Sequence, residues 1–204
     1  MSIRPPDTDD ELLGRLRAGD EAAFQVLYRR RQGAIYRFAV HVTGSSAVAE
    51  DITQEVFLAL IRNACRYDPE RGTLNGYLFG IARKLVLRHL ERTRMDVALD
   101  GANEEASAPQ LAIHDDPGMA LADRQRMEAL RRAVHCLPRR YREVVVLCDL
   151  EEVDYADAAA ILGCPIGTVR SRLHRARALL FEKLSQERAG RNEIKDLDPA
   201  RCWT

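Results

Sequence analysis

The chain has 204 residues, and its 31 Lys and Arg side chains balance its 31 Asp and Glu side chains. Hydrophobic residues form 46% of the composition and aromatic residues 6%, which favours helices rich in Leu, Ala and Val over aromatic-rich strands. The sequence has no run of about 18 apolar residues and no apolar segment after a basic start, so it predicts neither a bilayer span nor a secretory signal. We therefore expect a cytoplasmic protein without membrane insertion.

The first half of the chain has a helical pattern. From residue 10 to residue 94 apolar residues recur at helical spacing, and breaks that contain glycine interrupt the pattern. The pattern predicts four helices, at about 9–17, 20–43, 47–64 and 73–94. Asp20 and Thr73 are expected N-caps, because a short oxygen-bearing side chain accepts hydrogen bonds from the free N–H groups of a first turn. These helices form an expected first domain, residues 1–95.

An acidic stretch follows the first domain. Residues 96–123 contain seven Asp or Glu residues and no Lys or Arg, and the helical periodicity fades there. Two prolines and two glycines also occur in this stretch. Like charges repel and proline interrupts helices, so we expect a flexible linker over residues 96–118.

The second half of the chain again shows helical periodicity, with Pro138 at a helix start, where its missing N–H costs little. We expect a second domain over residues 119–185, with helices at 119–136, 139–148, 154–162 and 166–184. The tail, residues 186–204, is polar and contains Pro199, so we expect it to be disordered. The predicted fold class is all-α, with two small helical domains joined by a flexible acidic linker.

The cysteines have no spacing that is typical of a metal site. Their number is odd, and there is no Cys-x-x-Cys pair and no His at zinc-finger spacing. We expect small buried or incidental thiols, with neither a disulfide framework nor a metal or cofactor, for Cys65, Cys136, Cys148, Cys164 and Cys202.

The last predicted helix is strongly basic on one side. On a helical wheel, one face of residues 169–180 carries Val169, Leu173, Ala176 and Leu180. The opposite face carries Ser171, His174 and Arg175, and the flanking positions carry Arg170, Arg172 and Arg177. A short helix and Gly163, which can take the positive φ of a turn, precede it. This combination predicts that the second domain contains a helix-turn-helix.

A helix-turn-helix with a basic outer face favours double-stranded DNA as the ligand. Free N–H groups at a helix start bind phosphate, and arginine forks read guanine edges or hold the backbone. The alternative interpretation is a solvated charged face. The predicted DNA contacts are Gly167, Thr168, Arg170, Ser171, Arg172, His174, Arg175 and Arg177.

Both halves resemble one known family. The run "LPRRYREVVVLCDLEEVDYADAAAILGCPIGTVRSRLHRARALL" resembles the promoter-binding fourth region of the extracytoplasmic-function (ECF) sigma factors of bacterial RNA polymerase. The segments "AGDEAAFQVLYRR", "AEDITQEVFLALIRN" and "LNGYLFGIARKLVLRHLERTR" resemble their second region. The two matching halves, in the family order, cover about four-fifths of the chain.

The resemblance implies a polymerase-binding face on the third predicted helix. On the wheel, Ile52, Val56, Ala59 and Leu60 point into the bundle, while the opposite face is polar except for one leucine. In the family this segment docks on the coiled coil of the largest polymerase subunit. The residues that take this role are Asp51, Gln54, Glu55, Leu58 and Arg62. Phe57, at the side of this face, either packs internally or contributes to the dock.

The resemblance also implies that the loop and helix after residue 66 recognise the minus-ten promoter element. Cationic side chains of this segment can contact the phosphates of the DNA strand, and an aromatic side chain can stack on an extruded base. The expected contacts are Arg71, Tyr77, Arg83, Lys84 and Arg88. Tyr67 is a further candidate, although an aromatic residue at a helical position is more often part of a core. Tyr77 replaces the usual tryptophan of the family, and Lys84 a common asparagine.

The function that the resemblance implies is that of an alternative sigma factor, which is not an enzyme. Its expected partners are core RNA polymerase, at the coiled coil and the flap region, promoter DNA, contacted at the minus-ten and minus-thirty-five elements, and an anti-sigma factor. A stand-alone helix-turn-helix regulator is the alternative, but it requires a receiver or ligand domain, and no βα alternation is present to build one. A small helical enzyme is the second alternative, but the sequence offers no Gly-rich phosphate loop, no metal-ligand cluster and no nucleophile with a positioned base. An adaptor that binds only proteins is the third alternative.

Overall fold

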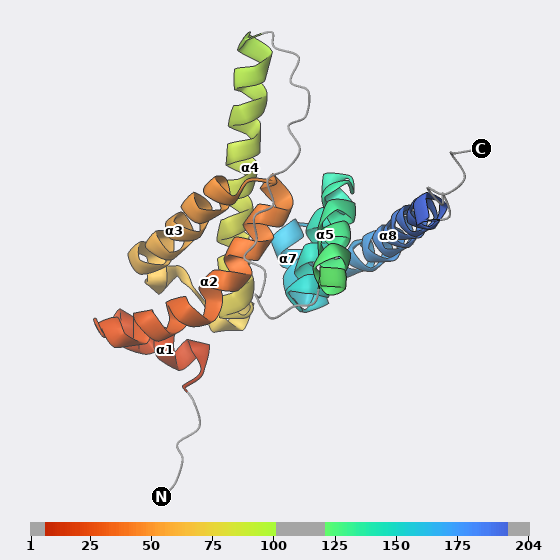
Figure 1. The fold of residues 1–204 in the computed structure, drawn as a ribbon. Helices are drawn as coiled ribbons and strands as arrows, with labels where there is room; N and C mark the ends of the chain where they lie inside the picture. The colour runs from red at the N-terminus through yellow and green to blue at the C-terminus, as the bar shows by residue number, and fades with distance from the viewer. Residues whose placement is uncertain (1–6, 101–120, 196–204) are drawn as a thin grey trace, which may run out of the picture.

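The computed structural model describes residues 7–100 and 121–195, with side chains for 7–95 and 123–186, and this part of the chain contains no strand (Figure 1). The first bundle consists of α1 (Asp9–Arg17), α2 (Glu21–Thr43), α3 (Ser46–Asn63), η1 (Ala64–Arg66), η2 (Pro69–Arg71) and α4 (Leu74–Asp100). The second consists of α5 (Leu121–His135), α6 (Arg139–Val145), the π-helical turn η3 (Val146–Leu150), α7 (Tyr155–Leu162) and α8 (Ile166–Lys195). The predicted all-α architecture is confirmed.

The predicted N-caps are present. The Asp20 carboxylate accepts hydrogen bonds from the N–H groups of Ala22 and Ala23, at 2.9 and 3.2 Å. The Thr73 hydroxyl accepts one from the Gly76 N–H at 3.0 Å. Each cap satisfies N–H groups that have no partner inside the helix, and it therefore fixes where α2 and α4 begin.

Both bundles enclose apolar cores. In the first, the rings of Phe38 (α2) and Phe79 (α4) meet edge to face with centroids 5.6 Å apart, and both side chains are fully buried. In the second, Leu137, Val144 and Leu173 are buried between α5, α6 and α8. None of the described helices combines the length and the apolar character that a bilayer span requires.

Two helices are longer than predicted. The α4 helix continues to Asp100, into the predicted linker, because no glycine or proline occurs before Gly101. The α8 helix continues to Lys195, into the tail that we expected to be disordered, because the strong helix formers Gln, Glu, Arg and Ala follow Ser185 and the first proline is Pro199. The rest of the predicted linker and tail, residues 101–118 and 196–204, lies outside the described residues.

The two bundles pack against each other, which the sequence did not predict. The α2 helix contacts α5 and α6, and α4 contacts α7. An Arg142 guanidinium N–H donates to the Val42 carbonyl at 3.0 Å, and Arg37 donates two hydrogen bonds to the Glu151 carboxylate at 2.8 and 2.6 Å. Figure 1 shows α4 projecting from one bundle and α8 from the other.

Candidate nucleic-acid interface

The α7–α8 pair has the predicted helix-turn-helix geometry. Gly163 ends α7 in the left-handed region with φ 63°, a conformation that costs glycine nothing. Ala159 is buried where the two helices meet, and Val169 returns to the core. The predicted apolar face of α8 is buried along its length, which leaves the opposite face outward.

The structure places the eight predicted DNA-binding residues at the start of α8. Thr168 and Arg172 are half-buried, and the other six are exposed. Arg177 donates two hydrogen bonds to the Asp149 carboxylate, at 3.0 and 2.6 Å, and this ion pair raises the pKa of its guanidinium further. The guanidinium carbon of Arg170 lies 6.0 Å from the centre of the Tyr155 ring, and Arg175 has a hydrogen bond with Tyr141.

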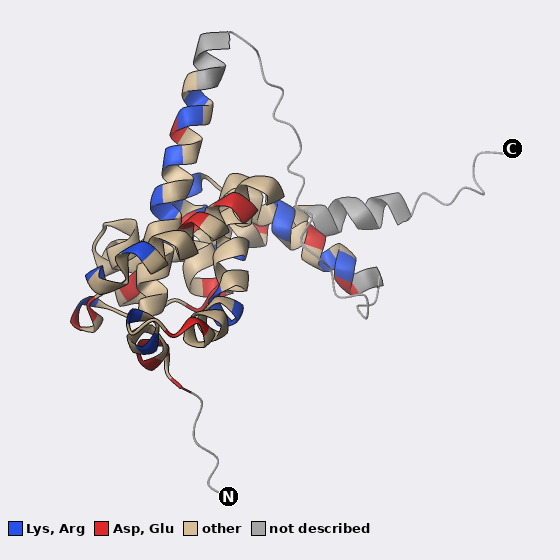
Figure 2. Cartoon of the chain, turned by 90° about the vertical axis from the view of Figure 1, so that its left-hand side faces the viewer, with Lys and Arg blue, Asp and Glu red and all other residues tan. Residues whose placement is uncertain are grey.

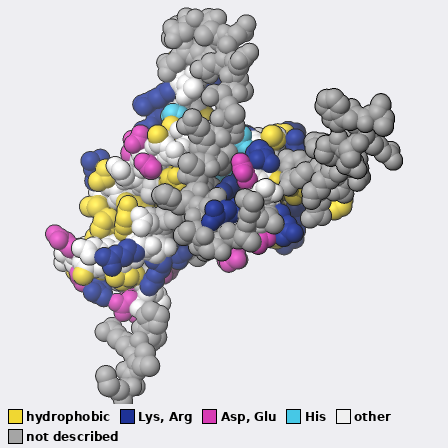
Figure 3. Space-filling view, viewed as in Figure 1, with side chains coloured by type: hydrophobic (Ala, Val, Ile, Leu, Met, Phe, Trp, Pro, Cys, Tyr) yellow, Lys and Arg dark blue, Asp and Glu magenta, His cyan; other side chains and the backbone are white. Residues whose placement is uncertain are grey.

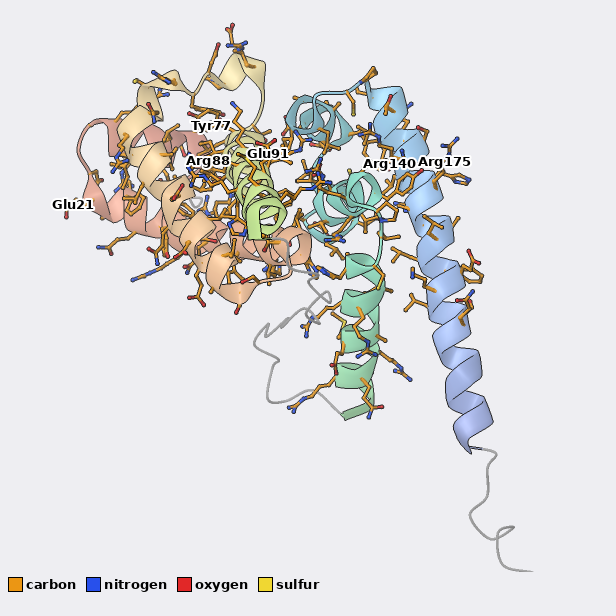
Figure 4. All side chains as sticks on the ribbon, turned by 90° about the horizontal axis from the view of Figure 1, so that it is seen from above. Glu21, Tyr77, Arg88, Glu91, Arg140 and Arg175 are labelled. Atoms are coloured by element: carbon orange, nitrogen blue, oxygen red, sulfur yellow. The ribbon has the colours of Figure 1, made fainter. Side chains whose placement is uncertain are left out.

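Arg140 on α6 belongs to the same surface, and the wheel of α8 did not include it. Figure 4 shows Arg140 beside Arg175. The Arg140 guanidinium carbon lies 4.8 Å from the centre of the Tyr141 ring. A hydrogen bond with Arg175 is the main reason that the pKa of Tyr141 lies below its ordinary value, and Arg140 adds to this effect. The run "RRYR" was the sequence signal for this extension.

The predicted polymerase-binding face lies on α3. Ile52, Val56 and Leu60 are buried as the wheel predicted. Asp51, Gln54, Glu55, Leu58 and Arg62 are all exposed. Leu58 exposes 47% of its surface and Ile61, one turn further on, 48%, so an apolar strip lies among charged groups. Figure 3 shows hydrophobic side chains gathered over this side of the first bundle.

Of the two alternatives for Phe57, the structure supports internal packing over a contribution to this face. Its side chain is 2% exposed, and its ring lies 4.7 Å from the Tyr28 ring and 6.3 Å from the Phe24 ring, both on α2. Aromatic pairs of this kind gain both from burial and from edge contacts. Phe57 therefore holds α3 on α2.

Tyr67 is also a structural residue rather than a DNA contact. Its hydroxyl donates a hydrogen bond to either of two acceptors, the Asp10 carboxylate at 2.8 Å and the Gly72 carbonyl at 3.2 Å. Burial, strengthened by Asp10, raises its pKa above the ordinary value. Tyr77 is half-buried, with its ring 5.6 Å from that of Tyr67. Tyr67 thus supports Tyr77, which remains open to one side.

The predicted minus-ten residues differ in their exposure and in the hydrogen bonds that their side chains already make. Arg71, Lys84 and Arg88 are exposed, and Figure 2 shows cationic residues repeated along the projecting part of α4. Arg88 donates a hydrogen bond to the Glu55 carboxylate at 2.8 Å. Arg83 is covered by the second bundle, because it donates to the Glu143 carboxylate at 3.0 Å and to the Ile161 carbonyl at 3.1 Å.

A cavity of about 320 Å³ lies beside these residues. The first bundle contributes Arg71, Tyr77 and Lys84 to its walls, and α7 contributes Asp157 and Ile161. Cations and the rings of Tyr67 and Tyr77 therefore line one side of a space that a helix of the second bundle closes on the other.

The described cysteines form no site. Cys65 and Cys136 are exposed, and Cys148 and Cys164 are half-buried, so the expectation of buried thiols is only partly met. Burial is the main cause that raises the pKa of Cys148 to about 11, and Asp149 adds to it. In the described part of the chain no group of three His, Cys, Asp or Glu side chains is arranged to hold a metal ion. Cys202 lies outside the described residues.

Comparisons with known families match both bundles. The family described as Sigma-70 region 2 matches residues 27–95, and Sigma-70, region 4 matches residues 127–180. The ECF RNA polymerase sigma-E factor of Escherichia coli K12 is 31% identical over 185 residues, which cover 87% of this chain and 94% of the relative. SigW of Bacillus subtilis is 28% identical, with 83% and 93% covered. SigE of Mycolicibacterium smegmatis is 36% identical, with 82% of this chain but 65% of the relative covered.

Solved structures show the same fold. The sigma factor RpoE of Bartonella quintana, crystallised with the anti-sigma factor NepR, superposes with a TM-score of 0.68 at 27% identity, with 79% of this chain and 96% of that chain covered. CnrH, solved with the cytosolic domain of CnrY, gives a TM-score of 0.65 at 23% identity, with 88% and 99% covered. The region 2 match sets aside a stand-alone helix-turn-helix regulator. The chain belongs to the ECF sigma factors of RNA polymerase, with regions 2 and 4 of the sigma-70 family, and functions as an alternative sigma factor in promoter recognition.

Proposed function

We propose that this sigma factor binds core RNA polymerase through the exposed face of α3 and recognises promoters with two separate surfaces. The first domain, residues 1–95, contacts the minus-ten element, and the second, residues 119–185, contacts the minus-thirty-five element. The observation that carries the proposal is that α3 and α8 each bury one face in their own bundle and expose the other. The two exposed faces differ in chemistry, which suits two different macromolecules.

The exposed face of α3 suits a helical protein partner. Leu58 and Ile61 offer apolar surface, and Asp51, Glu55 and Arg62 surround it with charges of both signs. Interfaces commonly have this composition, with an apolar centre that gives affinity and a charged rim that fixes orientation. The partner is the coiled coil of the largest polymerase subunit, while the second domain contacts the flap region.

The exposed face of α8 suits duplex DNA. Its first turn presents the exposed Gly167 and the half-buried Thr168 at a helix start, where the helix dipole favours a phosphate. The Thr168 N–H itself donates to the Pro165 carbonyl at 2.8 Å. Arg170 and Arg175 can fork onto base edges in the major groove, with Ser171 and His174 between them. Arg140 on α6 adds a backbone contact beside Arg175.

The minus-ten surface suits a melted strand. The phosphates of the strand contact the cationic side chains of Arg71, Lys84 and Arg88. A base stacks on the ring of Tyr77. Arg83 joins them once Glu143 has left it. Promoter choice then arises from two weak contacts that the polymerase joins, since the first raises the effective concentration of the second.

The protein makes and breaks no bond in this scheme, so it is an initiation factor rather than an enzyme and uses no cofactor. It acts in the cytoplasm, with the polymerase. Because the RpoE structure of Bartonella quintana contains an anti-sigma factor, we extend that kind of partner to this chain. Such an inhibitor covers the α3 face or the DNA-binding surfaces.

Co-elution with core polymerase in size exclusion tests the proposal. Leu58→Asp places a charge in the centre of the α3 face and abolishes co-elution. Val26→Asp is the matched control, because Val26 is an exposed aliphatic residue of the same bundle. It lies on the side of α2 opposite Phe24 and Tyr28, which pack on α3. Unchanged co-elution of Leu58→Asp would contradict the proposed docking face.

A further inference from the structure

Two tyrosines of the second bundle contact the exposed arginines of the duplex-binding surface, which are Arg140, Arg170, Arg175 and Arg177. Tyr141 lies on α6, and Tyr155 is the first residue of α7. Tyr141 is 8% exposed and belongs to the apolar core, whereas Tyr155 is 39% exposed. Because α6 and α7 both pack against α8, each tyrosine lies between α8 and a neighbouring helix.

Tyr141 contacts two of these arginines. The guanidinium carbon of Arg140 lies 4.8 Å from the centre of the Tyr141 ring. The Tyr141 hydroxyl accepts hydrogen bonds from Arg175 and from Arg140. Figure 4 shows Arg140 and Arg175 next to each other, although one belongs to α6 and the other to α8. Tyr141 thus connects an arginine of one helix to an arginine of the next.

Tyr155 contacts the other two arginines in a similar way. The guanidinium carbon of Arg170 lies 6.0 Å from the centre of the Tyr155 ring. The Tyr155 hydroxyl accepts a hydrogen bond from Arg177, and the Asp149 carboxylate accepts two more from the same guanidinium, at 3.0 and 2.6 Å. In both cases the ring of a tyrosine lies beside one arginine, and its hydroxyl bonds to another.

A ring contact leaves the donors of a guanidinium available. The cation is attracted to the electron-rich face of the ring, so the five N–H donors of the arginine can still bind DNA. A carboxylate acts differently, because Asp149 already occupies the Nε and one Nη of Arg177. Tyr155 can therefore restrict the motion of Arg170 without competing for the groups that contact bases or phosphates.

Restricting these side chains before DNA arrives makes binding more favourable. An arginine that moves freely in the unbound protein loses rotamer freedom when it contacts DNA, and this loss reduces the affinity. An arginine that already lies beside a ring has lost part of that freedom. Two arginines that contact one tyrosine also keep a defined spacing, which recognition of a duplex requires.

We propose that Tyr141 and Tyr155 are positioning residues of promoter recognition: they orient the arginines of the duplex-binding surface and act through them. The inference rests on the proposed function, because it concerns the same contact with the minus-thirty-five element. It adds two residues that lie on α6 and α7, outside the helix that contacts the major groove.

The test uses the full chain and the duplex that the wild type selects at low salt from a randomised library. Fluorescence anisotropy measures the affinity for this fluorescein-labelled duplex at several salt concentrations. Tyr155→Leu weakens binding about fivefold, the factor for ordering one long side chain. The slope of log affinity against log salt concentration stays as in wild type, because no positive charge is lost. Tyr155→Phe keeps the ring beside Arg170 and retains most of the wild-type affinity.

The matched control is Tyr36→Leu, the same exchange at a half-buried tyrosine on α2 of the first bundle. It binds the selected duplex as wild type does. Urea unfolding followed by circular dichroism measures the stability of every variant. A general loss of folding would weaken duplex binding in proportion to the unfolded fraction, and Tyr155→Leu must weaken it while the protein remains folded.

A double-mutant cycle separates positioning from a direct contact between the tyrosine and DNA. Arg170→Ala weakens duplex binding by itself and lowers the salt slope by about one. Because Tyr155 acts through Arg170, adding Tyr155→Leu to Arg170→Ala causes no further loss. Additive losses, or wild-type affinity of Tyr155→Leu, would overturn the inference.

The second cycle combines Tyr141→Phe with Arg175→Ala. Phenylalanine preserves the buried ring and removes only the hydroxyl that accepts the hydrogen bond from Arg175. The double variant binds as Arg175→Ala alone does, and an additive loss would overturn the role of Tyr141. Weaker binding by the two arginine variants, with wild-type binding by the tyrosine variants, leaves the proposed function intact and overturns only the positioning. Duplex binding by none of the proteins overturns both.

Discussion

We expect the burial of His41 to make the free energy of unfolding depend on pH. His41 lies on α2, 5% exposed, against α5 of the second bundle. Burial, and then the positive charges of Arg131 and Arg37, lower its pKa from 6.5 to about 4. The folded protein therefore keeps this imidazole neutral at pH values where the unfolded chain binds a proton. The contribution of the neutral His41 to the free energy of unfolding is present above pH 6.5, the pKa in the unfolded chain. It is lost as the pH decreases towards the pKa in the folded protein.

The size of the change in the free energy of unfolding follows from the lowered pKa of His41. While only the unfolded state holds the extra proton, each pH unit costs about 1.4 kcal/mol, so the step from pH 6.5 to pH 5 costs about 2 kcal/mol. Urea unfolding followed by circular dichroism measures the free energy of unfolding at both pH values. His41→Gln cannot titrate, so it loses about 2 kcal/mol less than wild type over the same step. Carboxylates titrate equally in both proteins and cancel in the comparison.

The same exchange on an exposed histidine provides the control. His174→Gln, on the outer face of α8, retains the wild-type difference between the two pH values. If wild type and His41→Gln lose equal free energy of unfolding between pH 6.5 and pH 5, the burial of a neutral His41 does not govern the acid sensitivity of this protein.

Three further substitutions test the fold and the DNA surface. Phe57→Ala lowers the free energy of unfolding by about 3–5 kcal/mol, because Phe57 is buried, whereas Leu58→Ala changes it by less than about 0.5 kcal/mol, because Leu58 is exposed. Equal losses for the two variants in urea unfolding would contradict this difference in burial. Gly163→Ala costs about 1–2 kcal/mol because of its φ of 63°, and an unchanged melting temperature would count against this turn. Arg175→Ala weakens binding of a minus-thirty-five duplex roughly tenfold. It also reduces the slope of log affinity against log salt concentration by about one, and titrations at several salt concentrations measure both effects.

Helical periodicity predicted the elements and most of their faces. The burial of Ile52, Val56 and Leu60, and the exposure of the charged residues between them, follow from a period of 3.6 residues. The wheel left the environment of Phe57 open because it shows only the direction of a side chain. The partner rings of Phe24 and Tyr28, on another helix, decide whether a side chain at that angle is covered.

Contacts between distant segments could not be predicted in this way. Arg83 appeared free in the sequence, but its partner Glu143 comes 60 residues later and belongs to the other bundle. Nothing periodic connects Thr73 with Asp157 either, although the Thr73 hydroxyl donates a hydrogen bond to the Asp157 carboxylate. The acidic linker suggested independent domains. The helix ends were also underestimated at α4 and α8, because the charged composition after each expected end resembles a loop although its residues favour helices.

Run-off transcription with purified core RNA polymerase on a genomic DNA library measures whether this protein directs the polymerase to promoters. We predict discrete start sites that appear only when this protein is added, that disappear when Leu58→Asp replaces the wild type, and that weaken when Arg175→Ala does. The same transcripts from core polymerase with and without the protein would contradict this prediction.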